Sequence, residues 1–200
     1  MKHSISSFLL LLFITVSYSQ NNISEAFSKS YQFEYNKDFT NAISALDEVY
    51  STNSYEINLR LGWLYYLNGD FSKSKNHYKN AIKSEPKSIE AKLGLAYPLG
   101  ALESWGELIT LYNEILKIDP FNYTVNLRMA NIYYYRKDFT KAEKFGEKIS
   151  KLYPFDFSYN VILGKINLSL GNIIHAKEHL NAALLYDPTA TEVLGLLKAL

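Results

Sequence analysis

Two histidines and a glutamate near the C-terminus have the spacing of a zinc-hydrolase pattern. His175, Glu178 and His179 fit H-x-x-E-H within the stretch HAKEH, and on a helix both imidazoles would share one face with the carboxylate beside them. A zinc site also needs a distant third ligand, and only 21 residues follow His179. Zinc hydrolysis is therefore a remote alternative, and we expect both imidazoles to point away from the core. We expect His77 to be a solvated helix residue.

The composition excludes several other kinds of chemistry. The 200-residue chain has no cysteine, which excludes disulfides and thiol catalysis. Its 21 Lys and Arg side chains balance 20 Asp and Glu, so no basic stripe is available for nucleic acid. The sequence has neither a P-loop nor G-x-G-x-x-G. We therefore expect no enzyme activity, cofactor, metal site, small-molecule substrate or nucleic-acid partner.

The N-terminal 19 residues have the pattern of a secretory signal peptide. A basic start at Lys2 precedes an apolar run from Phe8 to Val16, and small residues follow before Gln20. The run is shorter than the ~20 apolar residues that span a bilayer. We expect cleavage before Gln20 and a mature protein that is exported, to the periplasm or outside the cell. An uncleaved membrane anchor is the alternative.

The positions of the prolines reveal the elements that carry all these residues. Pro86, Pro120, Pro154 and Pro188 follow one another at intervals of 34 residues. Three further columns keep the same interval: large apolar residues at 61, 95, 129 and 163, small residues at 62, 96, 130 and 164, and apolar or aromatic residues at 71, 105, 139 and 173. Four columns with one spacing indicate an internal repeat.

Each period divides into two helices joined by a turn. Asn58, Leu61, Gly62 and Tyr65 lie on one helical face, the turn signal Asn-Gly-Asp follows at 68–70, and a second helical face runs to Pro86. Proline cannot continue a helix, so it ends the unit. A small residue such as Gly62 lets the two helices of a unit cross closely.

These repeats resemble the tetratricopeptide repeat, whose 34-residue pattern is W-x2-L-G-x2-Y, then A-x3-F, then P. Leu61, Gly62, Tyr65, Tyr78 and Pro86 carry the resemblance in one repeat, where Asn58 replaces the tryptophan. The resemblance implies an all-α, right-handed superhelical solenoid over 20–200, with about five helix-turn-helix repeats and a capping helix. The repeats are expected at about 23–54 (degenerate), 55–88, 89–122, 123–156 and 157–190, and the capping helix at 191–200.

Three places depart from the regular pattern. The first repeat has Lys29 and Ser30 where a large and a small apolar residue are expected, so it is interpreted as a worn N-terminal cap. Pro98 falls inside the first helix of the third repeat, which predicts a kinked or shortened helix. The C-terminal segment has an apolar stripe from Val193 to Leu200, as a capping helix requires.

The family resemblance implies that the first helix of each repeat lines a concave groove that binds an extended peptide or a partner helix. Carried over by register, the groove residues are Phe27, Tyr31, Tyr35, Leu59, Trp63, Tyr66, Tyr97, Leu127, Asn131, Tyr134 and Tyr135. Tyrosine and tryptophan are typical of binding hot spots. Leucines at 59 and 93 stand where a clamp for a terminal carboxylate would need charge, which argues against that function.

The main hypothesis from the sequence is a non-enzymatic scaffold that holds a protein or peptide in this aromatic groove. A structural subunit of a cell-envelope assembly is the alternative, binding through its convex or C-terminal surface.

Overall fold

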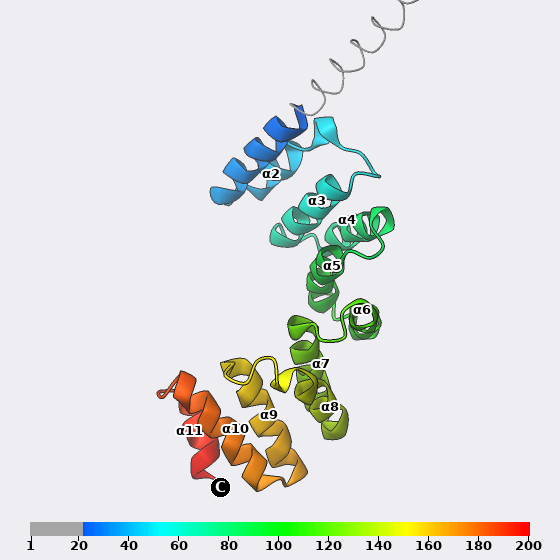
Figure 1. Ribbon diagram of the computed structural model, residues 1–200. Helices are drawn as coiled ribbons and strands as arrows, with labels where there is room; N and C mark the ends of the chain where they lie inside the picture. Colours follow the sequence, from blue (N-terminus) through cyan, green and yellow to red (C-terminus); the bar gives the residue numbers. More distant parts are fainter. Residues whose placement is uncertain (1–21) are drawn as a thin grey trace, which may run out of the picture. The chain divides into compact units, whose positions relative to one another are not determined.

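The computed structural model describes residues 22–200, and every regular element there is a helix (Figure 1). The expected all-α repeat fold is confirmed for these residues, whereas the expected signal segment 1–19 lies outside them. Within 22–200 no helix is both long enough and apolar enough to cross a bilayer. The chain forms two compact units that divide between Leu111 and Tyr112, where the sequence suggested one continuous domain over 20–200.

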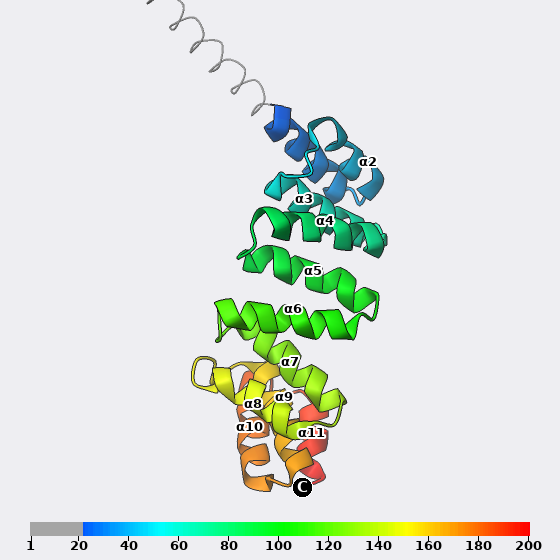
Figure 2. The ribbon, with the colours of Figure 1, turned by 90° about the vertical axis from the view of Figure 1, so that its right-hand side faces the viewer.

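The described part of the first unit is built from paired helices. Its elements are a helical segment over 22–35, α2 (Phe39–Ser44), the 3-10 helix η1 (Asp47–Val49), α3 (Tyr55–Leu67), α4 (Phe71–Ser84), α5 (Ile89–Ala101) and the start of α6 (Trp105–Ile118). α3 packs against α4, α4 packs against α5, and α3 also contacts α5 (Figure 2). Each helix pair therefore buries its apolar face on the next, because one repeat alone is too small to form a core.

The second unit begins within α6, at Tyr112, and is also built from paired helices. Its further elements are α7 (Tyr123–Tyr135), α8 (Phe139–Ser150), α9 (Phe157–Leu170), α10 (Ile173–Tyr186) and α11 (Thr191–Lys198). Each of these helices contacts the next one, and α7 also contacts α9. The expected capping helix is α11, which buries Val193 against the core and packs Leu196 and Leu197 beside it. Most of the predicted C-terminal apolar stripe is therefore used inside the unit.

A residue with left-handed backbone turns the chain between the two helices of every repeat. The residues at this turn are Lys37, Gly69, Glu103, Lys137 and Gly171, with φ angles of 59, 82, 52, 61 and 80°. In three repeats an aspartate follows the turn, and its carboxylate accepts a hydrogen bond from the third backbone N–H of the next helix. The turn is thus the same in all five repeats, including the degenerate first one.

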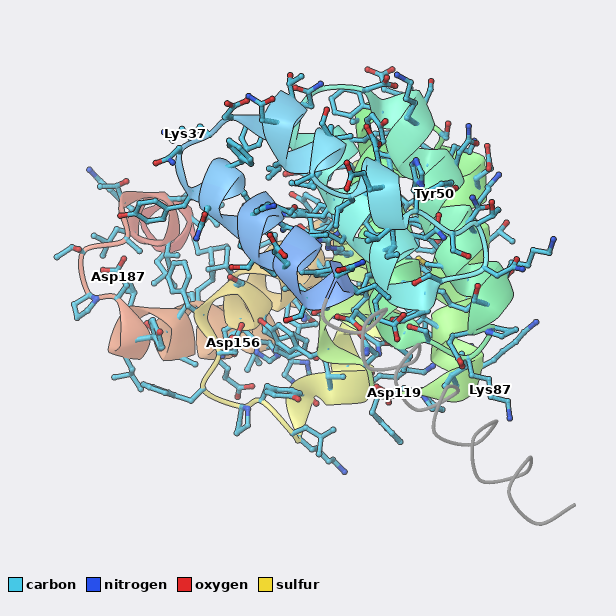
Figure 3. All side chains as sticks on the ribbon, turned by 90° about the horizontal axis from the view of Figure 1, so that it is seen from above. Lys37, Tyr50, Lys87, Asp119, Asp156 and Asp187 are labelled. Atoms are coloured by element: carbon cyan, nitrogen blue, oxygen red, sulfur yellow. The ribbon has the colours of Figure 1, made fainter. Side chains whose placement is uncertain are left out.

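Buried asparagines tie the loops between repeats to the first helix of a repeat. Asn58 Nδ2 donates to three carbonyls of the preceding loop, at 2.7 to 3.1 Å. Asn126 and Asn160 hold the same position in their repeats, and each donates to two carbonyls of its preceding loop. Figure 3 marks these two loops at Asp119 and Asp156. These asparagines stand where the family pattern has tryptophan, and they hold the preceding loop against the first helix of the repeat.

Two of these asparagines also accept a hydrogen bond from a histidine. Nδ1 of His77 lies 3.0 Å from Oδ1 of Asn58, and Nδ1 of His179 lies 2.9 Å from Oδ1 of Asn160. Since each asparagine donates through Nδ2, its Oδ1 accepts and the imidazole Nδ1–H is the donor. Burial lowers the pKa of both histidines. The expectations that His77 is solvated and that His179 points outward were therefore wrong, whereas His175 is exposed.

The helix around Pro98 is neither interrupted nor short. α5 spans 13 residues, as do α3 and α7, and it continues through Pro98 to Ala101. Of the predicted kinked or shortened helix, the shortened alternative was therefore wrong, and the kink stays a prediction. The ring of Pro98 is buried, and burial of this ring in the core offsets part of the missing hydrogen bond to the Gly94 carbonyl.

Candidate functional site: an aromatic cleft in the first unit

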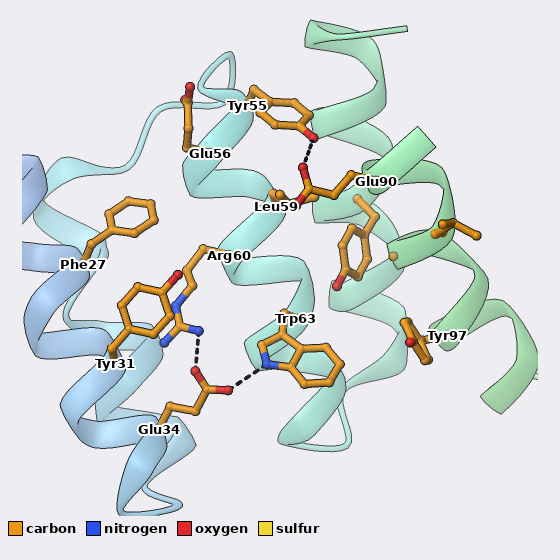
Figure 4. Close-up of a pocket in the computed structure, with 13 residues that line it drawn as sticks. Phe27, Tyr31, Glu34, Tyr55, Glu56, Leu59, Arg60, Trp63, Glu90 and Tyr97 are labelled. Atoms are coloured by element: carbon orange, nitrogen blue, oxygen red, sulfur yellow. Dashed lines mark hydrogen bonds and ion pairs between the residues drawn. The ribbon is translucent and has the colours of Figure 1, made fainter. Parts of the chain in front are cut away.

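The first unit contains a cleft of about 840 Å³. Figure 4 shows its residues on three neighbouring elements, the helical segment 22–35, α3 and α5. α4 also contributes one side chain, and the walls are mainly aromatic. The aromatic lining residues are Phe27, Tyr31, Tyr55, Trp63, Tyr78 and Tyr97. Large apolar walls with a few polar groups are typical of binding sites.

The inner end of the cleft forms because two glycines accept one tyrosine ring. A Cβ atom on Gly62 would lie 2.8 Å from the Tyr78 ring, and one on Gly94 would lie 2.2 Å from it. Both approaches are too close for any other residue, so the ring fits only between glycines. Burial raises the pKa of Tyr78, whose ring forms part of the lining together with Gly94.

A buried arginine supports the wall formed by segment 22–35. Arg60 on α3 is only 6% exposed, and its guanidinium makes an ion pair with Glu34. Its Nε donates to the hydroxyl of Ser30 at 3.1 Å, and its Cζ lies 3.8 Å from the centre of the Tyr31 ring. Ser30 is buried and occupies the position that holds a glycine or an alanine in the other repeats. These contacts join the first helix to the second repeat.

Glu34 also fixes the indole of Trp63. One carboxylate oxygen of Glu34 pairs with Arg60, and the other accepts a hydrogen bond of 2.7 Å from Trp63 Nε1 (Figure 4). The Trp63 ring further stacks on Tyr66, with centroids 5.8 Å apart, and meets the edge of Tyr97 at 5.9 Å. The tryptophan therefore already has one orientation before any partner arrives, which lowers the entropy cost of binding.

The opposite side of the cleft carries further carboxylates. The hydroxyl of Tyr55 donates to Glu90 at 2.9 Å and lies 2.8 Å from the hydroxyl of Ser88. Burial raises the pKa of Tyr55, so its hydroxyl stays protonated as a donor near neutral pH. Glu56 accepts a hydrogen bond from Ser54 at 3.2 Å. Both carboxylates belong to exposed residues on the rim.

The structure brings several of the predicted groove residues together in this cleft. Phe27, Tyr31, Leu59, Trp63 and Tyr97 all line it, and Tyr31 and Tyr97 are 56% and 40% exposed. Two other predicted residues of the first unit lie apart from the lining. Tyr66 touches Trp63 and Tyr97 from behind, and Tyr35 is 90% exposed.

The predicted groove residues of the second unit have different environments. Leu127 and Tyr134 are partly buried and pack against that unit's core. Asn131 donates to the carbonyl of Leu127 within its own helix at 2.8 Å. Tyr135 is 76% exposed and its ring contacts Tyr134. These four residues belong to the second unit. That they share one groove with the residues of the cleft stays a prediction.

Sequence reasoning missed the charged and polar part of the lining. Glu34, Arg60, Tyr55 and Glu90 all lie at the cleft. A signal existed for one of them, because an arginine recurs at 60 and 128, two periods apart. A charged residue that recurs on a core-facing helix is rare unless it is paired, so the column predicts a buried ion pair.

The HAKEH stretch forms no metal centre in this structure. His179 is engaged with Asn160, whereas His175 is exposed on α10. Among residues 22–200 no group of three or more His, Asp and Glu side chains could hold a metal ion.

Comparisons with known proteins agree with this fold. A family model described as tetratricopeptide repeat matches residues 55–88 and 157–189. A crystal structure of a tetratricopeptide repeat protein from Parabacteroides merdae superimposes with a TM-score of 0.77 at 17% identity, covering 88% of this chain and 71% of that one. The crystal structure of MamA superimposes with a TM-score of 0.72 at 17% identity, covering 86% and 96% of the two chains.

One curated protein is also similar in sequence. The BBSome complex member BBS4 of Mus musculus is 25% identical over 131 residues, which is 66% of this chain. The chain spans 25% of the length of that relative. The matched segments, the helix pairs and the structural similarity agree that the chain contains tetratricopeptide repeats.

Proposed function

We propose that the protein is a binding scaffold whose first unit holds a segment of a partner protein in the aromatic cleft. Tetratricopeptide repeats are in general non-enzymatic modules that bind proteins. BBS4, by its name, is a member of a complex, which is in keeping with such a role. The observation that carries the proposal is the cleft itself, about 840 Å³ in size and walled by tryptophan and tyrosine side chains.

Two features of the cleft favour protein binding. Tryptophan and tyrosine contribute large contact areas with few rotatable bonds, so they account for many interface hot spots. Trp63 is also held in place by Glu34, and this hydrogen bond is present without a partner. A partner segment would therefore bury apolar surface against Trp63, Leu59 and Leu93 without first ordering these residues.

Capture of partners from cells that produce the protein tests this proposal. Affinity-purified protein with Trp63→Ala and Tyr97→Ala should lose the co-purifying protein that the unchanged chain retains. Lys83→Ala is the matched control, because Lys83 is exposed on α4 and lies outside the cleft lining. Circular dichroism should give the same helix content for all three proteins. Capture that survives the double substitution would contradict the proposal.

We further propose that the protein is exported after cleavage before Gln20. The proposal rests on the sequence pattern of residues 1–19 alone. Mass spectrometry of the protein isolated from its native cells should find Gln20 at the N-terminus in a periplasmic or secreted fraction. A cytoplasmic protein that keeps Met1–Ser19 would overturn it.

A second candidate is a structural subunit that binds through the second unit. Exposed apolar side chains cluster near the ends of α8 and α10. The ring centroids of Phe155 and Tyr186 are 5.7 Å apart there, and Leu185 is 75% exposed. Phe155→Ser with Leu185→Ser should then remove the protein from its assembly while Trp63→Ala leaves it there. Retention of the Phe155→Ser and Leu185→Ser protein in the assembly would exclude this candidate.

A further inference from the structure

We infer that the segment held in the cleft is cationic, with a Lys or Arg side chain as its anchor. This inference rests on the proposed function of the cleft and names the chemistry of the occupant. Among the lining residues three are acidic, Glu34, Glu56 and Glu90, and one is basic, Arg60, so the formal charge is 1 − 3 = −2. A negative cleft with low-dielectric walls attracts cations and repels acidic segments.

Arg60 does not offset the charge that a ligand would meet. The ion pair with Glu34 neutralises its guanidinium, and the side chain is only 6% exposed. Its Nη2 is buried and lacks a hydrogen-bond partner among the described residues. Arg60 therefore acts as a support for the wall, and the cleft differs in sign from a clamp that would hold a terminal carboxylate.

Arg60 also shows which groups hold a cation in this environment. Its guanidinium lies over the Tyr31 ring and pairs with the Glu34 carboxylate, which is the combination of an aromatic face and an acid. The other side of the cleft also combines aromatic rings with acids. Tyr55 and Trp63 supply rings, while Glu56 and Glu90 accept hydrogen bonds from neutral hydroxyls that leave their charge in place.

The base of the cleft suits the rest of a long basic side chain. Leu59 and Leu93 line the cleft from α3 and α5. Lys and Arg pack their methylene stems on apolar surface while the charged end stays near solvent and acids. An anchor would place its stem on these leucines and its cation between Glu56 and Glu90.

The second unit has different residues at the corresponding positions, two periods of 34 later. Glu56 corresponds to Thr124, and Glu90 corresponds to Ser158. The position of Tyr97 is occupied by Lys165, which makes an ion pair with Glu192. The acidic and aromatic combination thus belongs to the first unit and is not a general property of the repeats.

Peptide binding to the full chain tests the inference. Three ten-residue peptides with blocked ends share one Leu-Ser-Gly framework and carry three Arg, three Gln or three Glu residues. Fluorescence anisotropy should give an affinity for the Arg peptide about tenfold higher than for the Gln peptide, and the difference should shrink as salt is raised. The Glu peptide should bind most weakly.

Substitution of the rim carboxylates separates charge from shape. Glu56→Gln with Glu90→Gln should reduce Arg-peptide affinity about tenfold and leave Gln-peptide affinity unchanged. Glu48→Gln with Glu85→Gln is the matched control, because both residues are exposed in the first unit outside the lining and the net charge changes equally. Equal losses in the two variants would overturn the inference, since a general field effect would then explain the binding.

Other outcomes distinguish the inference from the proposed function. If the Gln or Glu peptide binds as tightly as the Arg peptide, the occupant is not cationic and the inference fails. If none of the peptides binds but Trp63→Ala with Tyr97→Ala still abolishes partner capture, the inference fails and the proposed function stands. If no peptide binds and Trp63→Ala with Tyr97→Ala leaves partner capture intact, the inference and the proposed function both fail.

Discussion

At three corresponding positions of the two units, large and small side chains are exchanged. In the first unit the large residue is Tyr78, which fits between Gly62 and Gly94. Two periods later the corresponding residues are Ala130, Gly146 and Ile162, so the glycine now lies on the second helix. A Cβ on Gly146 would lie 2.6 Å from Leu163. Leu163, the residue after Ile162, fills the space at Gly146, so the two units close this helix contact with residues from different positions.

The glycine at position 94 also affects the surface of the first unit. Gly94 has no side chain to cover the Tyr78 ring, and both residues line the cleft. At the corresponding place in the second unit, Ile162 is buried in the core. The choice of which helix carries the large residue therefore decides whether a first helix leaves room at its inner face.

The largest expected effect comes from breaking this exchange. Gly94→Ile should destabilise the first unit by about 3 kcal/mol, because the new side chain has to displace the Tyr78 ring. Adding Tyr78→Gly removes the ring that the new side chain would meet and should recover about 2 kcal/mol through coupling between the two sites. Urea unfolding of the single and double variants measures both values. Gly100→Ala is the control, since a Cβ there meets nothing within 4 Å.

The second prediction compares the two recurring arginines. Glu34→Gln should cost about 2 kcal/mol, because it leaves the buried Arg60 guanidinium without its carboxylate. In the second unit Arg128 Nη1 donates to the neutral Tyr112 hydroxyl at 3.1 Å, and Tyr112→Phe should cost about 1 kcal/mol. Denaturant unfolding checks the order of the two effects. Equal costs would mean that the Arg60–Glu34 pair is no stronger than the hydrogen bond from Arg128 to a neutral hydroxyl.

The third prediction uses pH to compare repeats that carry a histidine with one that does not. Burial lowers the pKa of His77 and His179 below the unfolded value, so both contribute stability above about pH 6.5, which is lost as pH falls through and below that value. The corresponding residues between them are Leu111 and Phe145, and neither titrates. Thermal unfolding should show a smaller loss between pH 7.5 and 5 for His77→Phe than for the unchanged chain. An identical pH dependence of the two proteins would mean that folding does not lower the pKa of His77.

The smallest effect is expected at the shared left-handed turn. Lys137→Gly should stabilise the second unit by roughly 0.5 kcal/mol, because glycine adopts a φ of 61° without the Cβ penalty. Gly69→Ala should destabilise the first unit by about 1 kcal/mol for the opposite reason. The melting temperatures of the two variants should therefore move in opposite directions.

The fold could be predicted from the sequence because successive repeats place the same residue types at the same positions. The proline, large and small columns identify helix pairs without tertiary information, and α3, α4, α9 and α10 lie where those columns place them. The 34-residue spacing alone could not predict the His77–Asn58 bond, since neither residue belongs to the family pattern. Nor could local propensity predict that α5 runs through Pro98, because packing around a buried ring overrides it.

The candidate site was harder to predict than the fold. Register selects the first helices as the lining face, and this gave Tyr31, Trp63 and Tyr97 correctly as neighbours in one cleft. Register alone could not divide the chain into two units, and whether the residues of α7 share this groove stays a prediction. The polar lining depends on pairs such as Glu34 and Arg60, which come from different repeats and follow no shared period.

Site-specific photo-crosslinking tests most directly whether the first unit carries the partner-binding site. A benzophenone side chain is placed at Tyr97 in the cleft or at Tyr135, the more exposed tyrosine of the second unit, in cells that produce the protein. The account predicts a covalent partner adduct from position 97 that Trp63→Ala abolishes, and no adduct from position 135. An adduct that forms only from position 135 would contradict it.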